Sequence, residues 1–160
     1  MMEFFTIGVY NSTENEFFGK LIDNRIDTFC DIRQRRGVRG AEYSFVNSQR
    51  LQDKLADLDI KYGHVLALAP TTEIRDLQKE ADAQLGVQKR DRTQLGKVFQ
   101  IAYKDKILKN FDLDALLEQL ENAGAEKIVL FCVEEHHTAC HRSLVADKIE
   151  EKYGLKVTHL

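Results

Sequence analysis

Two short segments hold most of the side chains in this sequence that can do chemistry. One runs from Asp31 to Arg36 and the other from Cys132 to Arg142. They combine carboxylates, which can act as general acids or bases, with thiols, which can act as nucleophiles. They also contain arginines, whose planar guanidinium groups suit carboxylates and phosphates. This combination predicts a binding or catalytic site if the fold brings the two segments together.

Four residues are candidates for catalysis: Asp31, Glu134, Cys140 and His141. Asp31 and Glu134 come at the ends of apolar, strand-like runs, and we expect them either to orient the arginines or to act as acid or base groups. Cys140 stands at the predicted start of the last long helix. Unpaired backbone N–H groups and the helix dipole favour an anion there and can lower the pKa of a thiol. His141 or Arg142, the next two residues, is placed to activate that thiol.

Five residues are candidates for holding an anionic ligand: Tyr10, Arg33, Arg35, Arg36 and Arg142. The four arginines within residues 33–39 form the densest positive cluster in the chain, whereas the formal net charge of the whole chain is −3. Anion binding must therefore come from local clustering of basic residues rather than from the overall charge.

A zinc site is an alternative use of the second segment. The possible ligands are Cys132, His136, His137, Cys140 and His141. Structural zinc sites usually show closely spaced ligand pairs, and only His137 and His141 have such a spacing. We therefore expect neither a metal nor a cofactor, and keep a metal near Cys132, His137 and Cys140 as the alternative.

Five apolar runs rich in β-branched and aromatic residues predict strands. They cover residues 3–10, 28–32, 62–68, 127–133 and 156–160. Segments with helical periodicity separate them, which predicts a three-layer α/β fold with a mainly parallel sheet of about five strands and helices on both faces. In such sheets ligands bind beyond the carboxyl ends of the strands. Because the candidate residues follow the first, second and fourth strands, we expect them to meet in one pocket.

Local signals mark where several helices begin and end. Thr13 and Glu16 have the spacing of a capping box, and Asp112 is placed to cap a later helix. Gly124 and Gly154 are placed to end helices. Residues 84–92 contain a glycine and several charges between two helical patterns, so we expect an exposed and mobile segment, a possible flap over the pocket.

The composition is that of an ordinary globular domain, with 43% hydrophobic and 31% charged residues in 160. That length predicts a single domain, residues 1–160. The chain has three cysteines, and neither a secretory signal nor an apolar run of membrane-spanning length is apparent. We therefore expect a cytoplasmic protein without a membrane partner.

Several motifs together resemble a widespread microbial family, the domain of unknown function 488. They are Ile7-Gly8, Asp31-Ile32-Arg33, Tyr43-Ser44-Phe45, Tyr62-Gly63-His64 and the C-x-E-x5-C-H-R series from Cys132 to Arg142. The last series is the most specific of them, and the resemblance covers nearly the whole chain. It implies an α/β fold and no established activity.

Three functions are compatible with these residues. The first is binding of, or action on, a phosphate-bearing ligand, either a nucleotide or a nucleic-acid backbone. The second is a cysteine-dependent enzyme or redox protein that uses Cys140, with Cys132 as a resolving partner. The third is a structural or assembly domain in which the polar cluster only ties the strand-end loops together.

Overall fold

The computed structural model describes residues 1–160, except for the side chain of Arg90. Over these residues the chain forms a five-stranded parallel sheet in the order β3-β2-β4-β1-β5. The strands are β1 (Glu3–Ile7), β2 (Thr28–Asp31), β3 (Lys61–His64), β4 (Lys127–Phe131) and β5 (Val157–His159). The predicted α/β fold class is confirmed.

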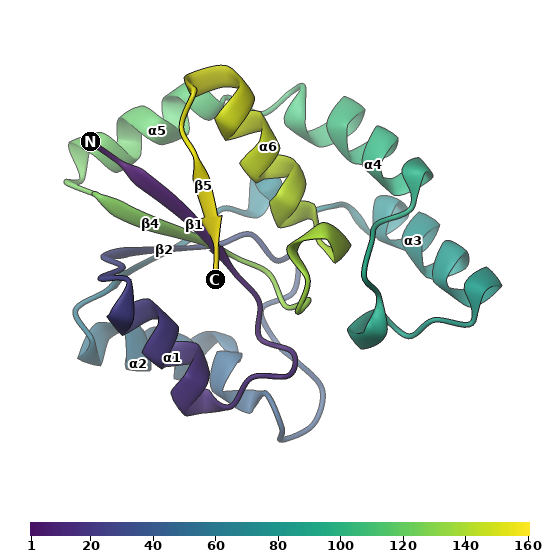
Figure 1. Ribbon diagram of the computed structural model, residues 1–160, viewed down its shortest axis with the longest axis horizontal. Helices are drawn as coiled ribbons and strands as arrows, with labels where there is room; N and C mark the ends of the chain where they lie inside the picture. The colour runs from purple at the N-terminus through teal and green to yellow at the C-terminus, as the bar shows by residue number, and fades with distance from the viewer.

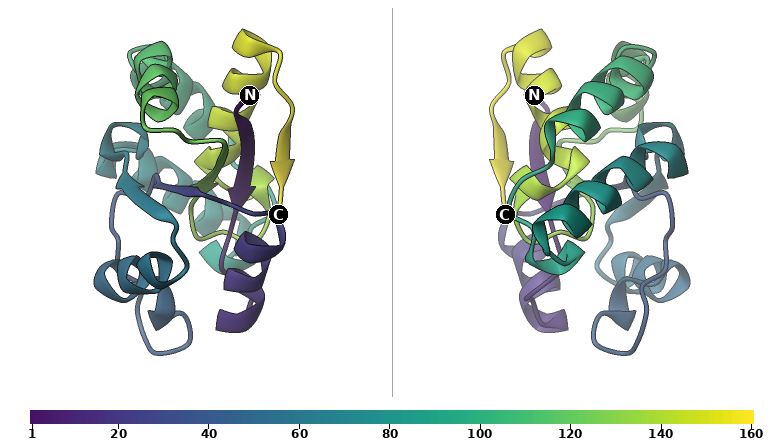
Figure 2. Two further views of the ribbon diagram at one scale, coloured as in Figure 1. Left: turned by 90° about the vertical axis from the view of Figure 1, so that its left-hand side faces the viewer. Right: turned by 90° about the vertical axis from the view of Figure 1, so that its right-hand side faces the viewer.

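Helices cover both faces of the sheet. They are α1 (Glu14–Asp23), α2 (Ser48–Asp57), α3 (Thr72–Leu85), α4 (Lys97–Tyr103), α5 (Leu113–Asn122) and α6 (His141–Tyr153). Figure 1 shows α1 and α2 on one face and α5 and α6 on the other. The pair α3 and α4 lies beside α6, beyond the carboxyl ends of the strands (Figures 1 and 2). This pair therefore closes the end of the sheet at which the candidate residues were expected.

The predicted helix boundaries rest on side-chain caps, and the structure contains those caps. Thr13 and Glu16 form the reciprocal bonds of a capping box at the start of α1. The carboxylate of Asp112 accepts a bond from the backbone N–H of Ala115 at the start of α5. Gly154 ends α6 in the left-handed conformation, which costs a residue without a Cβ little.

All five strands are shorter than predicted, and β1 and β3 end three and four residues early because the chain leaves the sheet there. After Ile7 the chain turns away, and the carbonyl of Val133 accepts bonds from the N–H groups of both Val9 and Tyr10. After His64 the chain passes the end of β2, its only neighbour, and Leu66–Leu68 form a short 3-10 helix instead. A predicted strand cannot continue where no partner strand remains to accept its hydrogen bonds.

The topological switch point, at which neighbouring strands send their connections to opposite faces of the sheet, lies at the centre of the sheet. Strand β4 lies between β1 and β2. The chain leaves β2 towards α2 on one face and leaves β4 towards α6 on the other, as Figure 1 shows. Loops that part in this way open a crevice at the carboxyl ends of the strands, where α/β proteins bind their ligands.

Residues 84–92 only partly match the expected flap. Residues 84–86 and 88–89 are exposed, but Arg92 is buried and bonded to three other residues. The side chain of Arg90 belongs to this segment and lies outside the described residues.

No helix in the described part of the chain is both long enough and apolar enough to cross a membrane.

His159 makes the stability of the edge strand β5 sensitive to acid. Its Nδ1 lies 2.6 Å from Oγ1 of Thr6, and its ring stacks on His137 with centroids 3.6 Å apart. Burial, then His137 and Arg142, lower the pKa of His159 to about 4. In the unfolded chain the pKa is about 6.5. Between these two values the unfolded state binds more protons, so stability falls as the pH drops through this window.

We therefore expect the melting temperature to fall between pH 7 and pH 4.5, and to fall less in His159→Asn, which keeps a polar group near Thr6. The exposed histidine His136 offers the matched control, His136→Asn. Thermal unfolding followed by circular dichroism across this pH range measures the difference. Equal pH dependence in the two variants would contradict the role of His159.

Candidate functional site

A cavity of about 750 Å³ opens beyond the carboxyl ends of β2 and β4. Its walls come from the loop after β2, helix α3, the segment before α4, the loop after β4 and the first turn of α6. Six of the nine predicted site residues line it: Tyr10, Arg33, Arg35, Glu134, Cys140 and His141. The fold therefore brings most of both sequence segments to one place.

Asp31 does not line the cavity, but its carboxylate binds Arg33, which does. Its Oδ1 accepts bonds from Nε and the backbone N–H of Arg33 at 2.9 and 3.2 Å. Its Oδ2 accepts bonds from Nη2 of Arg33 and the hydroxyl of Tyr62, both at 2.8 Å. With both oxygens occupied and no exposed surface, Asp31 positions Arg33. Of the two roles predicted for Asp31, orienting an arginine fits these contacts, whereas acid or base catalysis does not match this environment.

Contacts with several neighbouring groups hold the guanidinium of Arg33 in place. Its Nη2 also donates to the carbonyl of Val46 at 2.9 Å, and the guanidinium lies 4.7 Å over the ring of Phe131. Its Nη1 is buried and has no hydrogen-bond partner among the described residues. A buried donor without a partner is costly, so this cation is suited to receive an acceptor from a ligand.

Arg36 and Arg142 also lie outside the cavity lining. Arg36 interacts with the hydroxyl of Tyr62. Arg142 is buried, and its Nη1 and Nη2 donate to the carbonyls of Glu134 and Glu135 at 2.6 and 3.1 Å. Its Nε is buried without a partner among the described residues, but both terminal nitrogens are taken up by carbonyls and the side chain does not line the cavity. We therefore revise the predicted role of Arg142 from anion binding to holding the loop between β4 and α6.

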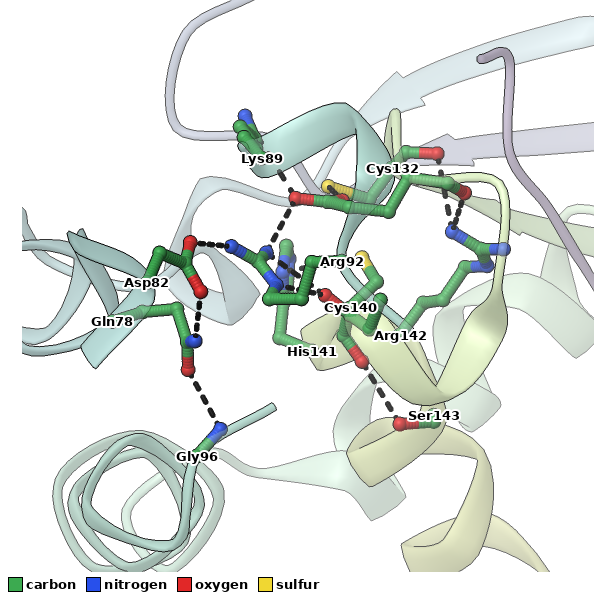
Figure 3. Close-up of polar contacts among 12 residues, drawn as sticks. Gln78, Asp82, Lys89, Arg92, Gly96, Cys132, Cys140, His141, Arg142 and Ser143 are labelled. Carbon is green, nitrogen blue, oxygen red and sulfur yellow. Dashed lines mark hydrogen bonds and ion pairs between the residues drawn. The ribbon is translucent and has the colours of Figure 1, made fainter. Parts of the chain in front are cut away.

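Sequence reasoning missed Arg92, the residue that joins α3 to the loop after β4 (Figure 3). Its guanidinium donates to Asp82 at 2.7 Å, to Glu134 at 3.0 Å and to the carbonyl of Ala139 at 2.9 Å. Asp82 in turn accepts a bond from Gln78 at 2.7 Å. The arginine and both of its acidic partners are buried. They form a connected polar network at the edge of the cavity.

Burial and neighbouring charges set the protonation of the groups on the cavity floor. Burial opposes the charge on Glu134, but Lys89 and Arg92 outweigh it and lower its pKa to about 2. Burial raises the pKa of the Cys132 thiol well above its usual value. Burial also opposes the charge on His141, whereas Cys132, Glu134 and the carbonyl of Ile32 favour it and raise its pKa. Glu134 is thus a carboxylate near neutral pH, and Cys132 is a thiol.

Two cysteines and one histidine meet on this floor. Sγ of Cys140 lies 3.6 Å from Nδ1 of His141, and Sγ of Cys132 lies 3.3 Å from the carboxylate of Glu134. Nε2 of His141 lies 2.8 Å from the carbonyl oxygen of Ile32. His137, a possible metal ligand by its position in the sequence, stacks on His159 instead.

The family model described as Domain of unknown function DUF488 matches residues 13–149, which include all the walls of the cavity except the one at Tyr10. The chain belongs to this family. In this DUF488 member the matched residues supply both the buried Asp31–Arg33 pair and the Cys132, Cys140 and His141 group. No curated protein and no solved structure is similar enough to the chain to give a match.

Proposed function

We propose that this domain binds a phosphate-bearing ligand in the cavity beyond β2 and β4. The observation that carries the proposal is the charge of the cavity walls. Seven lysines and arginines line it, against three acidic residues, although the whole chain has a formal net charge of −3. The cations are Arg33, Arg35, Arg39, Arg75, Lys79, Lys89 and Arg92. Such local clustering attracts and orients an anion.

The basic side chains that line the cavity differ in how firmly the protein holds them. Arg33 is rigid, and one of its donors has no protein partner. Arg35 is exposed on the loop after β2, and Arg75 lies on α3. We infer that Arg33 contacts the ligand at the floor of the cavity while Arg35 and Arg75 contact it from two walls. Arginine suits this role because its fork can bind two phosphate oxygens at once.

The shape of the cavity favours a nucleotide over a long nucleic acid. Its volume of about 750 Å³ falls in the range of small-molecule sites, which is roughly 300–1,000 Å³. Tyr10 and Tyr43 both line it, with ring centroids 5.3 Å apart, and offer an aromatic surface for a base. The unpaired state of Cys30, Cys132 and Cys140 supports the cytoplasm as the place of action.

The test is binding of ATP, measured by calorimetry, to the wild type and to Arg35→Glu/Arg75→Glu. A charge-assisted hydrogen bond contributes about 1.5–3 kcal/mol, so losing two should weaken binding by about 100-fold or more. The control is Lys104→Glu/Lys109→Glu, which makes the same charge change at exposed sites away from the cavity. It should leave the affinity within a few-fold of the wild type.

Equal loss of affinity in both double variants would show a general charge effect and contradict the cavity as the binding site. A fluorescent 20-nucleotide DNA strand, followed by anisotropy, tests the other phosphate source. Binding of DNA but not ATP, with an affinity that falls steeply with salt, would shift the proposal to the nucleic-acid backbone.

A second candidate, a cysteine-dependent enzyme, is favoured by one observation. His141 lies 3.6 Å from the Cys140 sulfur on one side and 2.8 Å from the carbonyl oxygen of Ile32 on the other. A nucleophile beside a base that a third group orients is the arrangement found in thiol enzymes. The anion site remains the first proposal, because Cys140 is almost fully buried.

A further inference from the structure

Three potential metal-binding atoms converge on the floor of the cavity. They are Sγ of Cys132, Sγ of Cys140 and Nδ1 of His141, and all lie within 4.8 Å of one another. Zinc binds sulfur at about 2.3 Å and imidazole nitrogen at about 2.0–2.1 Å, in tetrahedral geometry. A sulfur and a nitrogen on one such ion are then separated by about 3.6 Å. The separation of Cys140 Sγ and His141 Nδ1 is 3.6 Å.

The hydrogen bond on the far side of His141 is a second, independent sign of a metal ligand. Nε2 lies 2.8 Å from the carbonyl oxygen of Ile32, an acceptor, so this nitrogen carries the proton. Nδ1 is then unprotonated in the neutral ring and directs its lone pair towards the cysteines. Histidines that bind metals almost always donate their other N–H to a carbonyl or carboxylate in this way.

We propose that Cys132, Cys140 and His141 bind one Zn²⁺ ion, with the fourth coordination position facing the cavity. Thiolate and imidazole ligands select zinc over magnesium and calcium, which prefer oxygen. All three residues line the cavity although their side chains are largely buried, so the fourth position is placed on the cavity side of the ion. Three protein ligands with one open position are typical of catalytic zinc sites, whereas structural sites use four.

Glu134 completes the surroundings of this site. Its carboxylate lies 3.3 Å from Sγ of Cys132, and Arg92 holds it at 3.0 Å. It therefore accepts the hydrogen bond of the Cys132 thiol beside the proposed site, and Arg92 compensates its negative charge when that thiol ionises. Two thiolates neutralise the charge of Zn²⁺, so the bound ion leaves the cationic cavity walls unchanged. The zinc site does not depend on the proposed anion ligand.

The test is a titration of chelator-treated, reduced protein with Zn²⁺ and with Co²⁺. We expect one ion per chain and a thiolate-to-Co²⁺ charge-transfer absorption. Release of at least two protons per Zn²⁺ is also expected near neutral pH, because both thiols must ionise and any protonated His141 must lose its proton. Cys132→Ser, Cys140→Ser and His141→Asn should each weaken binding by more than about 100-fold, which exceeds the effect of removing a second-shell partner. Cys30→Ala removes the third cysteine, outside the site, and should keep one ion per chain.

Two further measurements keep the proposal falsifiable if a variant fails to fold. In the wild type, bound Zn²⁺ should protect Cys132 and Cys140 from alkylation and leave the labelling of Cys30 unchanged. Arg35→Glu/Arg75→Glu should bind Zn²⁺ like the wild type, which separates this site from anion binding. Absence of a charge-transfer band, or zinc binding that survives all three ligand variants, would overturn the proposal. Fast alkylation of Cys140 without zinc uptake would overturn it in favour of the cysteine-dependent enzyme.

Discussion

Replacing Arg92 with methionine should destabilise the domain by about 3–5 kcal/mol, the usual effect of removing one partner of a buried ion pair. The arginine is buried between Asp82 and Glu134, at 2.7 and 3.0 Å. Methionine fills a similar volume but leaves both carboxylates buried without their cation. It also leaves the carbonyl of Ala139 without its donor. Urea unfolding followed by fluorescence or circular dichroism measures the change in the free energy of unfolding.

Lys89 provides the matched control, because it is the other cation near Glu134. Its ammonium lies 3.8 Å from the same carboxylate but on an exposed side chain. Lys89→Met should therefore cost less than about 1 kcal/mol, as exposed ion pairs usually do. A loss of similar size in the two variants would show that the Arg92 network does not hold α3 against the loop after β4.

The difference between Arg92 and Arg33 shows what sequence reasoning could predict here. Arg33 follows a strand, and the rule that ligands lie beyond the carboxyl ends of parallel strands placed it correctly at the cavity. Arg92 lies in a connector between two helices, where charges and a glycine are typical of exposed loops. Its burial depends on Asp82 and Glu134, which are 10 and 42 residues away in the chain. Contacts between residues so far apart in the chain produce no local sequence pattern from which the burial of Arg92 could be predicted.

Arg142 shows a second limit. Its position in the first turn of α6 was predicted, and the structure has it there. Residue type and position cannot tell whether a guanidinium faces a ligand or backbone carbonyls, and here it bonds to Glu134 and Glu135. The same limit applies to the histidines. His137 and His141 are both near the cysteines in sequence, and only the turn before α6 decides that His141 faces them.

Gly8→Ala should destabilise the domain by about 3 kcal/mol or more, at the upper end of what overpacking costs. A Cβ at this position would lie 1.9 Å from the carbonyl oxygen of Glu134 and 3.1 Å from Nη2 of Arg142. Gly8 is not among the glycines with positive φ, so close approach of the backbone is the reason for glycine here. That carbonyl accepts the 2.6 Å bond from Arg142, so the loop must move and lose this bond.

Moving this loop displaces the residues on either side of it. Cys132 and Glu134 lie on it, and Cys140 follows at the start of α6. We therefore expect Gly8→Ala to weaken Zn²⁺ and ATP binding as well as stability, although Gly8 does not line the cavity. Equilibrium unfolding gives the stability change, and the two titrations give the binding changes at a temperature where the variant is folded.

Gly19→Ala is the control, and it should change the stability of the domain in the opposite direction to Gly8→Ala. It lies within α1, and a Cβ there would meet nothing within 4 Å. Alanine in a helix interior is favoured over glycine by about 0.5–1 kcal/mol, so Gly19→Ala should stabilise the domain slightly and leave both ligands bound. If Gly8→Ala were as stable as Gly19→Ala, the β4–α6 loop would not be held against β1 as the structure shows. The positioning role assigned to Arg142 would then fail with it.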